Sequence, residues 1–200
     1  MSAAQTLDGG FADPVFGAQS NFRALMDALA NPGLPQGLGG VERSAGLSPE
    51  LAAVALTLCD HDTPLWLDLA LAESEAIVAW LRFQTGAPLT TDPARAHFAL
   101  VSEGASLPRL DRFGLGTDEY PDRSTTVALA LPGLEGGPAL TLRGPGIKDV
   151  RSLSPRGLPA DFLAHWRDNR ALFPRGVDLL LVAGGQVIGL PRTTRISMEG

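Results

Sequence analysis

Two apolar runs separated by glycines stand in Val177-Asp-Leu-Leu-Leu-Val-Ala-Gly-Gly-Gln-Val-Ile-Gly-Leu190. Runs rich in valine, isoleucine and other apolar residues are typical of buried strands. A pair of glycines between two such runs suits the tight turn of a hairpin. We therefore predict that Val177–Val182 and Gln186–Leu190 pair as an antiparallel hairpin.

A second hairpin is predicted upstream, where the apolar runs Thr125–Leu131 and Ala139–Leu142 are joined by the proline- and glycine-rich segment 132–138. Between the two hairpins, the apolar residues of Pro159–Leu172 recur with helical spacing. The residues of this helix that are predicted to face the core are Phe162, Leu163, Trp166 and Ala171.

Three helices are predicted in the first half of the chain. The first covers Ser20–Ala30, with Ser20 as its cap and Asn31-Pro32-Gly33 as its end. The second begins at Ser48-Pro49-Glu50, where a hydroxyl can cap the helix and proline fits the first turn. The third covers Glu73–Gln84 and ends near Gly86. The residues predicted to face the core are Phe22, Leu25, Met26, Leu29, Leu51, Val54, Ala55, Leu58, Ile77, Trp80 and Leu81.

Strands predicted at Leu65–Leu69 and His97–Val101 flank the third helix. A strand–helix–strand unit favours parallel pairing through a right-handed crossover. Added to the antiparallel hairpins, this unit predicts a mixed sheet flanked by helices. We therefore predict a single α/β domain over residues 1–200, built as a three-layer αβα sandwich.

Composition narrows the classes of function. Of the 200 residues, 44% are hydrophobic and 19% charged, and the formal net charge is −6. This acidic balance argues against nucleic-acid binding, which needs a basic face. No apolar run approaches the ~20 residues that span a bilayer, and the N-terminus lacks the pattern of a signal peptide. We expect a cytoplasmic protein with neither a nucleic-acid nor a membrane partner.

One cluster combines several reactive side chains, Cys59-Asp60-His61-Asp62. It can be interpreted as a base, His61, that is oriented by an aspartate and acts with Cys59 as nucleophile. It can also be the end of a helix, followed by a turn, because neighbours in sequence point in different directions on a helix. We favour the structural interpretation, and the role of Asp60-His61-Asp62 stays open.

The sequence has few residues that could bind a metal ion or a cofactor. The histidines at 61, 97 and 165 fall on three different predicted elements, without the spacing of a metal site. The single lysine, Lys148, is the only group that could hold pyridoxal phosphate, and it stands in a turn beside Asp149. We therefore predict no metal, no cofactor and no catalytic residue in this chain.

The turn that follows Ala139–Leu142 combines glycines with cations. Arg143, Gly144, Gly146 and Lys148 can be interpreted as an anion-binding loop, because exposed backbone NH groups and arginine forks suit phosphate. The other interpretation, which we favour, is a tight turn whose glycines supply positive φ. If the loop binds an anion, the alternative function is a stand-alone enzyme or binder of a phosphorylated small molecule through Arg143–Arg151.

Seven motifs, in order along the chain, resemble the PhnH family, a subunit of the bacterial carbon–phosphorus lyase system. The resemblance covers residues 10–196. The motifs are Gly10-Phe-Ala-Asp-Pro-Val15, Phe22-Arg-Ala-Leu-Met-Asp-Ala-Leu29 with Pro32-Gly33, Thr63-Pro-Leu-Trp66, Glu119-Tyr-Pro-Asp-Arg-Ser124, Leu142-Arg-Gly-Pro-Gly-Ile147, Phe173-Pro-Arg-Gly-Val-Asp178 and Leu190-Pro-Arg-Thr-Thr194.

The resemblance implies a cytoplasmic homodimer that joins other subunits of the carbon–phosphorus lyase core complex. It implies a role in phosphonate catabolism, at the step that forms alpha-D-ribose 1-methylphosphonate 5-triphosphate from MgATP and methylphosphonate. It further implies a fold similar to the large domain of pyridoxal-phosphate-dependent transferases, without the cofactor site. The family pattern supplies no catalytic residues to transfer, so we expect a structural or assisting subunit of a transferase complex.

Overall fold

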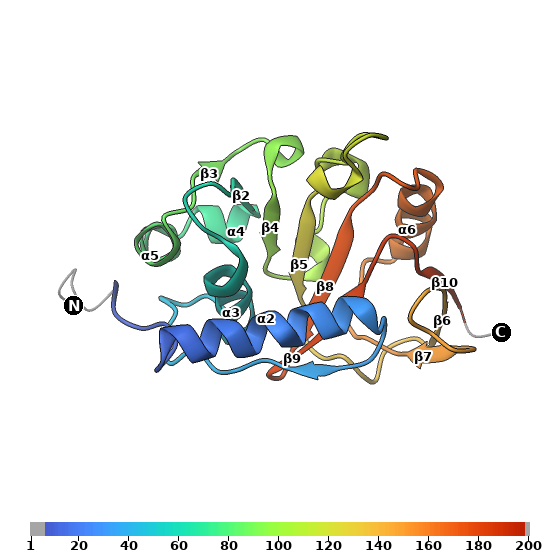
Figure 1. Cartoon of the computed structure of the whole chain (residues 1–200), viewed down its shortest axis with the longest axis horizontal. Coiled ribbons are helices and arrows are strands. Elements are labelled where there is room, and N and C mark those ends of the chain that lie inside the picture. Colours follow the sequence, from blue (N-terminus) through green and yellow to red (C-terminus); the bar gives the residue numbers. More distant parts are fainter. Residues whose placement is uncertain (1–6, 199–200) are drawn as a thin grey trace.

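The computed structural model describes residues 7–198, and its centre is a seven-stranded mixed sheet (Figure 1). Five neighbouring strands, from β8 to β3, run parallel. At one side, β9 pairs antiparallel with β8, and β1 pairs antiparallel with β9. The prediction of a mixed α/β sheet is confirmed. In spatial order the strands are β1 (Gln36–Gly37), β9 (Gln186–Leu190), β8 (Asp178–Ala183), β5 (Thr126–Ala130), β4 (Phe98–Val101), β2 (Leu65–Leu67) and β3 (Leu89–Thr90).

The hairpin predicted from the first quoted segment is confirmed. Strands β8 and β9 pair antiparallel, with Leu179 opposite Leu190 and Ala183 opposite Gln186. The turn between them is Gly184-Gly185, and both glycines have positive φ, 58° and 71°. These angles belong to the tight turn whose twist matches that of the two strands.

The prediction that Thr125–Leu131 and Ala139–Leu142 form a hairpin is wrong. Strand β5 lies between β4 and β8 and is parallel to both, whereas the run Ala139–Leu142 contributes to a separate three-stranded antiparallel sheet. The central residues of β5 are all buried, as in a strand covered on both faces, and such a strand belongs inside a parallel sheet. The strands of the small sheet are, in spatial order, β10 (Arg195–Met198), β6 (Leu140–Arg143) and β7 (Arg151–Leu153).

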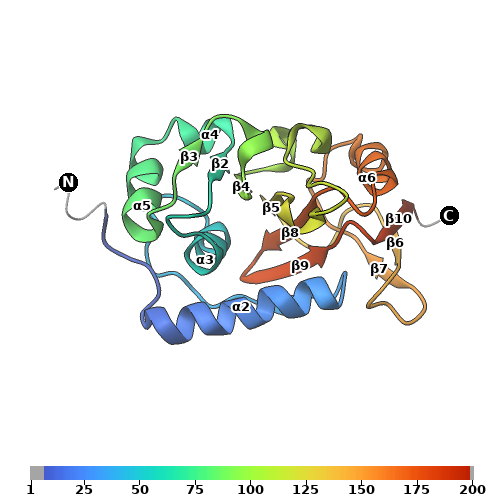
Figure 2. The same ribbon diagram turned by 45° about the horizontal axis from the view of Figure 1, so that its top comes forward.

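Alternate residues of the large sheet point into two cores. From β8, Leu180 and Val182 join one core, and Leu179 and Leu181 join the other. The first core is covered by α2 (Pro14–Ala30), α3 (Pro49–Leu58) and α5 (Glu75–Thr85), the second by α6 (Phe162–Ala171) and the small sheet. Figure 2 shows α2 along one side of the sheet, with α6 and the small sheet together near the C-terminus. Shorter helices in the described residues are α4 (Leu69–Ala72) and the 3-10 turns Pro93–Arg95, Gly104–Ser106, Leu110–Arg112 and Pro121–Arg123.

Most predicted helix and strand positions in the first half are confirmed, with shifted ends. Ser48 caps α3, Ser74 caps α5, and Gly86 ends α5 in the left-handed conformation. Strands β2 and β4 are parallel, as predicted. Strand β2 stops at Leu67, however, because the side chain of Asp68 accepts a hydrogen bond from Leu71 N (2.9 Å) and starts α4.

Helix α2 begins earlier than predicted and presents a different face to the core. Asp13, not Ser20, is its cap, and Asp13 Oδ1 accepts hydrogen bonds from the backbone NH groups of the first turn. Its buried residues are Asn21, Leu25 and Ala28. Two residues predicted to be inside, Phe22 and Met26, are 49% and 39% exposed.

The close approach of α2 to β9 explains this rotation. A Cβ atom on Gly189 would lie 2.7 Å from Leu29 N, so only glycine lets the helix backbone rest on the strand. Small residues such as Ala28 therefore face the sheet, and larger apolar residues turn outward. The buried face of α6 also differs from the prediction. Ala171, which was predicted to face the core, is exposed, whereas Asn169 is buried.

We expect Gly189→Ala to lower the free energy of unfolding by about 1–3 kcal/mol, because the added methyl group forces α2 away from β9. Urea denaturation followed by circular dichroism measures this loss. The control is Gly37→Ala in the edge strand β1, where a Cβ atom meets nothing within 4 Å. The control should change stability by no more than about 0.5 kcal/mol. Equal stability of the two variants would contradict the packing argument.

Candidate functional site

A pocket of about 300 Å³ opens between the small sheet and the end of α6. Three segments form it: the end of β6 with the following turn, the end of α6, and the connection from β9 to β10. Four of its eight lining residues are arginines and none is acidic, so the pocket suits an anion. The lining residues are Arg143, Gly144, Pro145, Arg170, Phe173, Arg192, Thr193 and Arg195.

The predicted anion-binding residues separate into two groups. Arg143 and Gly144 line the pocket, whereas Gly146 and Lys148 do not. Gly146 packs against the end of α2, where a Cβ atom would lie 2.7 Å from Pro32 Cδ, and Lys148 is exposed. The loop is therefore shaped by contact with α2, and only its first residues reach the pocket.

Two further contacts hold this loop. Arg151 Nη1 donates hydrogen bonds to the carbonyl oxygens of Asn31 (3.1 Å) and Pro32 (2.6 Å), at the end of α2. Gly144 has φ 146°, and a Cβ atom there would lie 3.2 Å from Thr193 O. Glycine at this position lets the turn after β6 approach the chain that leads into β10.

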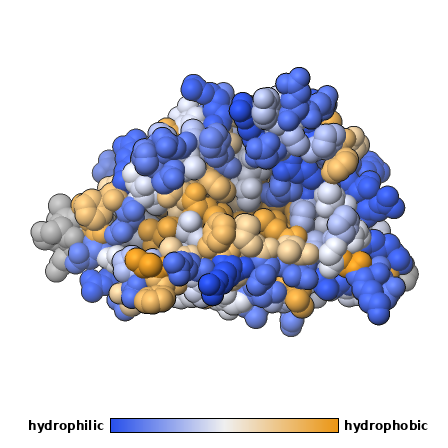
Figure 3. Space-filling view, in the orientation of Figure 1, coloured by the Kyte–Doolittle hydropathy of each residue, from blue (hydrophilic) through white to orange (hydrophobic). Residues whose placement is uncertain are grey.

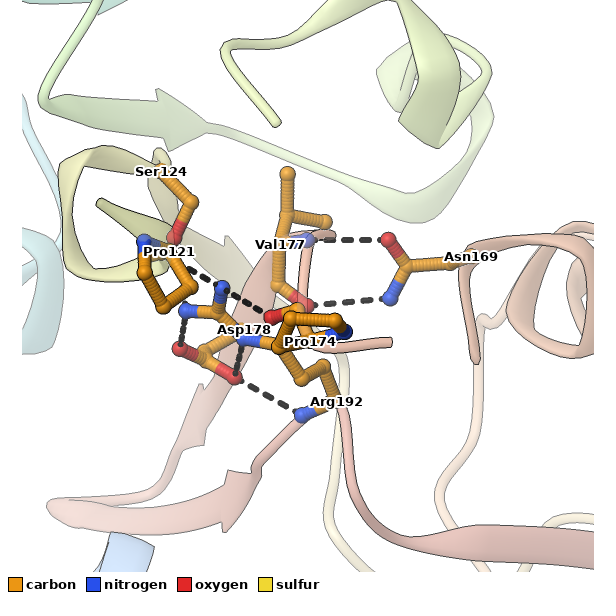
Figure 4. A network of polar contacts seen from close by, with 7 residues as sticks. All are labelled: Pro121, Ser124, Asn169, Pro174, Val177, Asp178 and Arg192. Carbon is orange, nitrogen blue, oxygen red and sulfur yellow. Dashed lines mark hydrogen bonds and ion pairs between the residues drawn. The ribbon is translucent and has the colours of Figure 1, made fainter. Parts of the chain in front are cut away.

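Arg192 forms one wall of the pocket, and its guanidinium is already engaged (Figure 4). Its Nε donates to Asp178 Oδ1 (3.1 Å), and its Nη2 donates to Asp178 Oδ2 and to Ser124 Oγ (2.6 Å). Its Nη1 donates to the carbonyl oxygens of Pro121 (2.8 Å) and Pro174 (3.4 Å). Only 13% of the Arg192 side chain and 19% of the Asp178 side chain are exposed, so this pair is structural.

The same region explains three of the quoted motifs. The motif at 119–124 supplies Pro121 and Ser124, the motif at 173–178 supplies Asp178, and the motif at 190–194 supplies Arg192. The three segments thus meet around one guanidinium, although 71 positions separate Pro121 from Arg192.

Asn169 fixes the beginning of β8 from the opposite side. Its side-chain amide donates to Val177 O (3.0 Å), and its carbonyl accepts from Val177 N (2.9 Å), as Figure 4 shows. Gly176 makes this approach possible, because a Cβ atom there would lie 2.8 Å from Asn169 Oδ1. The apolar spacing of α6 carried no sign of this polar contact.

The Cys59-Asp60-His61-Asp62 cluster does not form a catalytic arrangement. Burial, with the charge of Asp60, raises the pKa of the Cys59 thiol to about 12. His61 Nε2 lies 3.3 Å from Asp62 Oδ2 on the exposed surface. A hydrogen bond from Asp62 N, above all, lowers the pKa of Asp60. The cysteine faces the core and the histidine faces solvent, which supports a helix end followed by a turn.

Within residues 7–198, no three His, Cys, Asp or Glu side chains come together in a group that could hold a metal ion. Over the same residues, no helix has the length and apolarity to cross a membrane.

The ion pair of Asp178 with Arg192 could have been predicted from the sequence by counting residues outward from the Gly184-Gly185 turn. The register that pairs Ala183 with Gln186 brings Asp178 to the open end of the hairpin, beside Pro191 and Arg192. Opposite charges at that place predict an ion pair. By contrast, Arg170 and Arg195 come from α6 and β10, and nothing in their local sequence places them beside Arg143.

Comparisons with known proteins agree with each other. The family described as bacterial phosphonate metabolism protein (PhnH) matches residues 9–197. The alpha-D-ribose 1-methylphosphonate 5-triphosphate synthase subunit PhnH of Rhizobium meliloti (strain 1021) is 51% identical over 199 residues, with 98% of each chain covered. The putative C-P lyase subunit protein HtxG of Stutzerimonas stutzeri is 33% identical over 183 residues, which cover 91% of this chain and 87% of that protein.

We expect Arg192→Ala to cost about 3–5 kcal/mol of unfolding free energy, because it leaves the carboxylate of Asp178 buried without its partner. Arg192→Lys should recover part of this loss, since lysine keeps the charge but not the fork. The control is Arg109→Ala, whose partners Asp111 and Asp168 lie on the exposed surface. Urea denaturation should place the control near the wild type. A similarly small loss for Arg192→Ala would contradict the structural role.

The raised pKa of Cys59 predicts a pH dependence of stability. The folded state keeps the thiol protonated, so its stabilising contribution is complete below pH 9.0 and is lost as the pH rises toward about 12. The variant Cys59→Ala should therefore lose less unfolding free energy than the wild type over this alkaline range. Urea titrations at a series of pH values measure the difference, and parallel curves would show that the thiol does not titrate as proposed.

Proposed function

The chain belongs to the PhnH family of bacterial phosphonate metabolism proteins, and on that basis we propose that it is a subunit of the enzyme that makes alpha-D-ribose 1-methylphosphonate 5-triphosphate. One observation carries this proposal: the 51% identity to the Rhizobium meliloti subunit extends over 98% of both chains. The name of the Stutzerimonas stutzeri relative, a putative C-P lyase subunit, is consistent with it.

We further propose that the chain assists the reaction without an active site of its own. Cys59, the single cysteine, is buried, and burial raises the pKa of its thiol. His61 is exposed, and its nearest carboxylate, Asp62, is exposed as well. His165 of α6 pairs with Asp161 (3.2 Å), the residue just before that helix. The thiol is thus buried, His61 faces solvent, and His165 belongs to another element, an arrangement that supports an assisting role.

An exposed apolar stripe on α2 supports assembly with other protein chains. Val15, Phe22 and Met26 recur at helical spacing on the outer face of α2, and Val15 is 64% exposed. Figure 3 shows hydrophobic residues gathered across the middle of the face on which α2 lies, bordered by hydrophilic residues above and below. Exposed apolar patches of this kind mark protein interfaces.

We assign this α2 stripe to contact between two copies of the chain. A helix face on the outside of a molecule can pair with itself about a two-fold axis. The edges of the large sheet are less suitable, because β1 and β3 have two residues each and offer little backbone for pairing with another strand. The homodimer then joins the other subunits.

Three further expectations belong to the same proposal. The chain acts as one α/β unit of three layers, its fold resembles the large domain of pyridoxal-phosphate-dependent transferases, and it works in the cytoplasm. The resemblance of the seven motifs supports these statements. The alternative, a stand-alone enzyme or binder that uses the Arg143–Arg151 loop, keeps one supporting observation: Arg143 and Gly144 line the arginine-rich pocket.

The assembly can be tested by co-expressing the chain with the other subunits of the carbon–phosphorus lyase system. We expect co-migration in size-exclusion chromatography, and we expect the isolated chain to have the mass of a dimer by light scattering. If the chain co-migrates with none of these subunits, the proposed function is contradicted.

The α2 stripe has its own test. Substituting both Phe22 and Met26 by glutamate should convert the dimer to a folded monomer, because two charges would then be desolvated at the interface. The control is Phe83→Glu on α5, which is 66% exposed and lies outside the stripe. A dimer that survives the double substitution would contradict the assignment of this surface.

A further inference from the structure

Two arginines lie side by side on neighbouring strands of the small sheet. In the antiparallel pair of β6 and β10, Arg143 is directly opposite Arg195. Like charges at directly opposed positions of a sheet repel each other and are destabilising. No carboxylate oxygen of residues 7–198 lies within 4.0 Å of either guanidinium, so no negative charge offsets the repulsion. Both arginines are exposed, and an anion bound between them would offset this repulsion.

A third arginine approaches the same pocket from α6. Arg170 stands in the last turn of the helix, and its Nε atom is buried with no acceptor among the described residues. The negative end of the helix dipole favours a cation here, but it does not satisfy the Nε–H group. Because Nε is closed off from solvent, a ligand in the pocket meets Arg170 through its charge and its terminal nitrogens.

Arg192 does not contribute its charge to the pocket. Each nitrogen of its guanidinium is bonded within the protein, and Asp178 neutralises it. The pocket therefore holds three formal positive charges, from Arg143, Arg170 and Arg195, without an acid among its lining residues. The wall also includes Phe173, whose side chain is 61% exposed and offers an apolar surface beside the cations.

We propose that this pocket binds a small molecule that carries a dianionic phosphoryl group. The oxygens of the group accept hydrogen bonds from Arg143 and Arg195 on the small sheet and from Arg170 on α6. Arginine forks match the geometry of phosphate oxygens, and such charge-assisted hydrogen bonds are the strong ones. The rest of the ligand lies against Phe173. A volume of about 300 Å³ is at the lower end of the range for small-molecule sites.

This site differs from the glycine-rich loop that the sequence suggested. It keeps Arg143 and Gly144, replaces Lys148 with two arginines from distant segments, and gives Gly146 a packing role only. The inference does not depend on the subunit role, because it rests on the charges and contacts of the isolated chain.

Isothermal titration calorimetry of the purified full-length chain tests the proposal with three probes. Phenyl phosphate combines a dianion with a ring that can pack on Phe173, inorganic phosphate has the charge alone, and benzenesulfonate has the ring with a single charge. We expect phenyl phosphate to bind most tightly and benzenesulfonate at least about tenfold more weakly, since each tenfold step is 1.4 kcal/mol. Equal binding of phenyl phosphate and benzenesulfonate, or no binding of either phosphate, would overturn the proposal.

Three variants locate the site. Arg195→Gln should weaken the binding of phenyl phosphate about tenfold or more, whereas Arg167→Gln, exposed on α6 outside the pocket, should not. Lys148→Gln should also leave binding unchanged. Equal losses in the Arg195 and Arg167 variants would overturn the proposal, because they would indicate a general effect of net charge.

The thermal stability of Arg195→Gln excludes misfolding as an explanation. Without ligand, its melting temperature should equal or exceed that of the wild type, because the repulsion with Arg143 is removed. With phenyl phosphate, the wild type should gain melting temperature and the variant should not. A variant that melts well below the wild type without ligand would contradict the predicted repulsion.

Discussion

The ion pair between Arg192 and Asp178 is the interaction on which the C-terminal half of the structure depends. It closes the open end of the β8–β9 hairpin, and the same guanidinium binds the carbonyl oxygens of Pro121 and Pro174. Because one rigid, planar group bonds to several segments at once, it sets the start of β8 and the path from β9 to β10. A lysine could supply the charge but not this set of directed hydrogen bonds.

The position of the arginine pocket follows from that path. After Arg192 the chain turns into β10, and the register of β10 on β6 places Arg195 opposite Arg143. Trp166 of α6 donates a hydrogen bond to Thr194 O (2.9 Å), which holds the same connection against the helix that carries Arg170. Arg192 is thus paired with an acid, whereas no acid of residues 7–198 pairs with the other three arginines of the pocket.

The sequence predicted the parts of the fold whose signals are local. The capping residues Ser48 and Asp68 act within their own turns, although only Ser48 was recognised, and the glycine turn set the register of β8 and β9. It did not predict the partner of β5, because an apolar run pairs equally well with strands near or distant in sequence. The outward rotation of Phe22 was also missed, since it depends on the contact of α2 with Gly189, a residue far along the chain. The candidate site shows the same limit: Arg143 was found from its turn, while Arg170 and Arg195 were brought to it by tertiary contacts.

Hydrogen–deuterium exchange of the Arg192→Lys variant tests most directly whether this guanidinium organises the region. We expect faster exchange of backbone amides in segments 119–125 and 173–178, with the protection of β4 unchanged, because β4 pairs with β2 and β5 independently of Arg192. Exchange that accelerates equally over the whole chain, or that stays at the wild-type rate in both segments, would contradict the account.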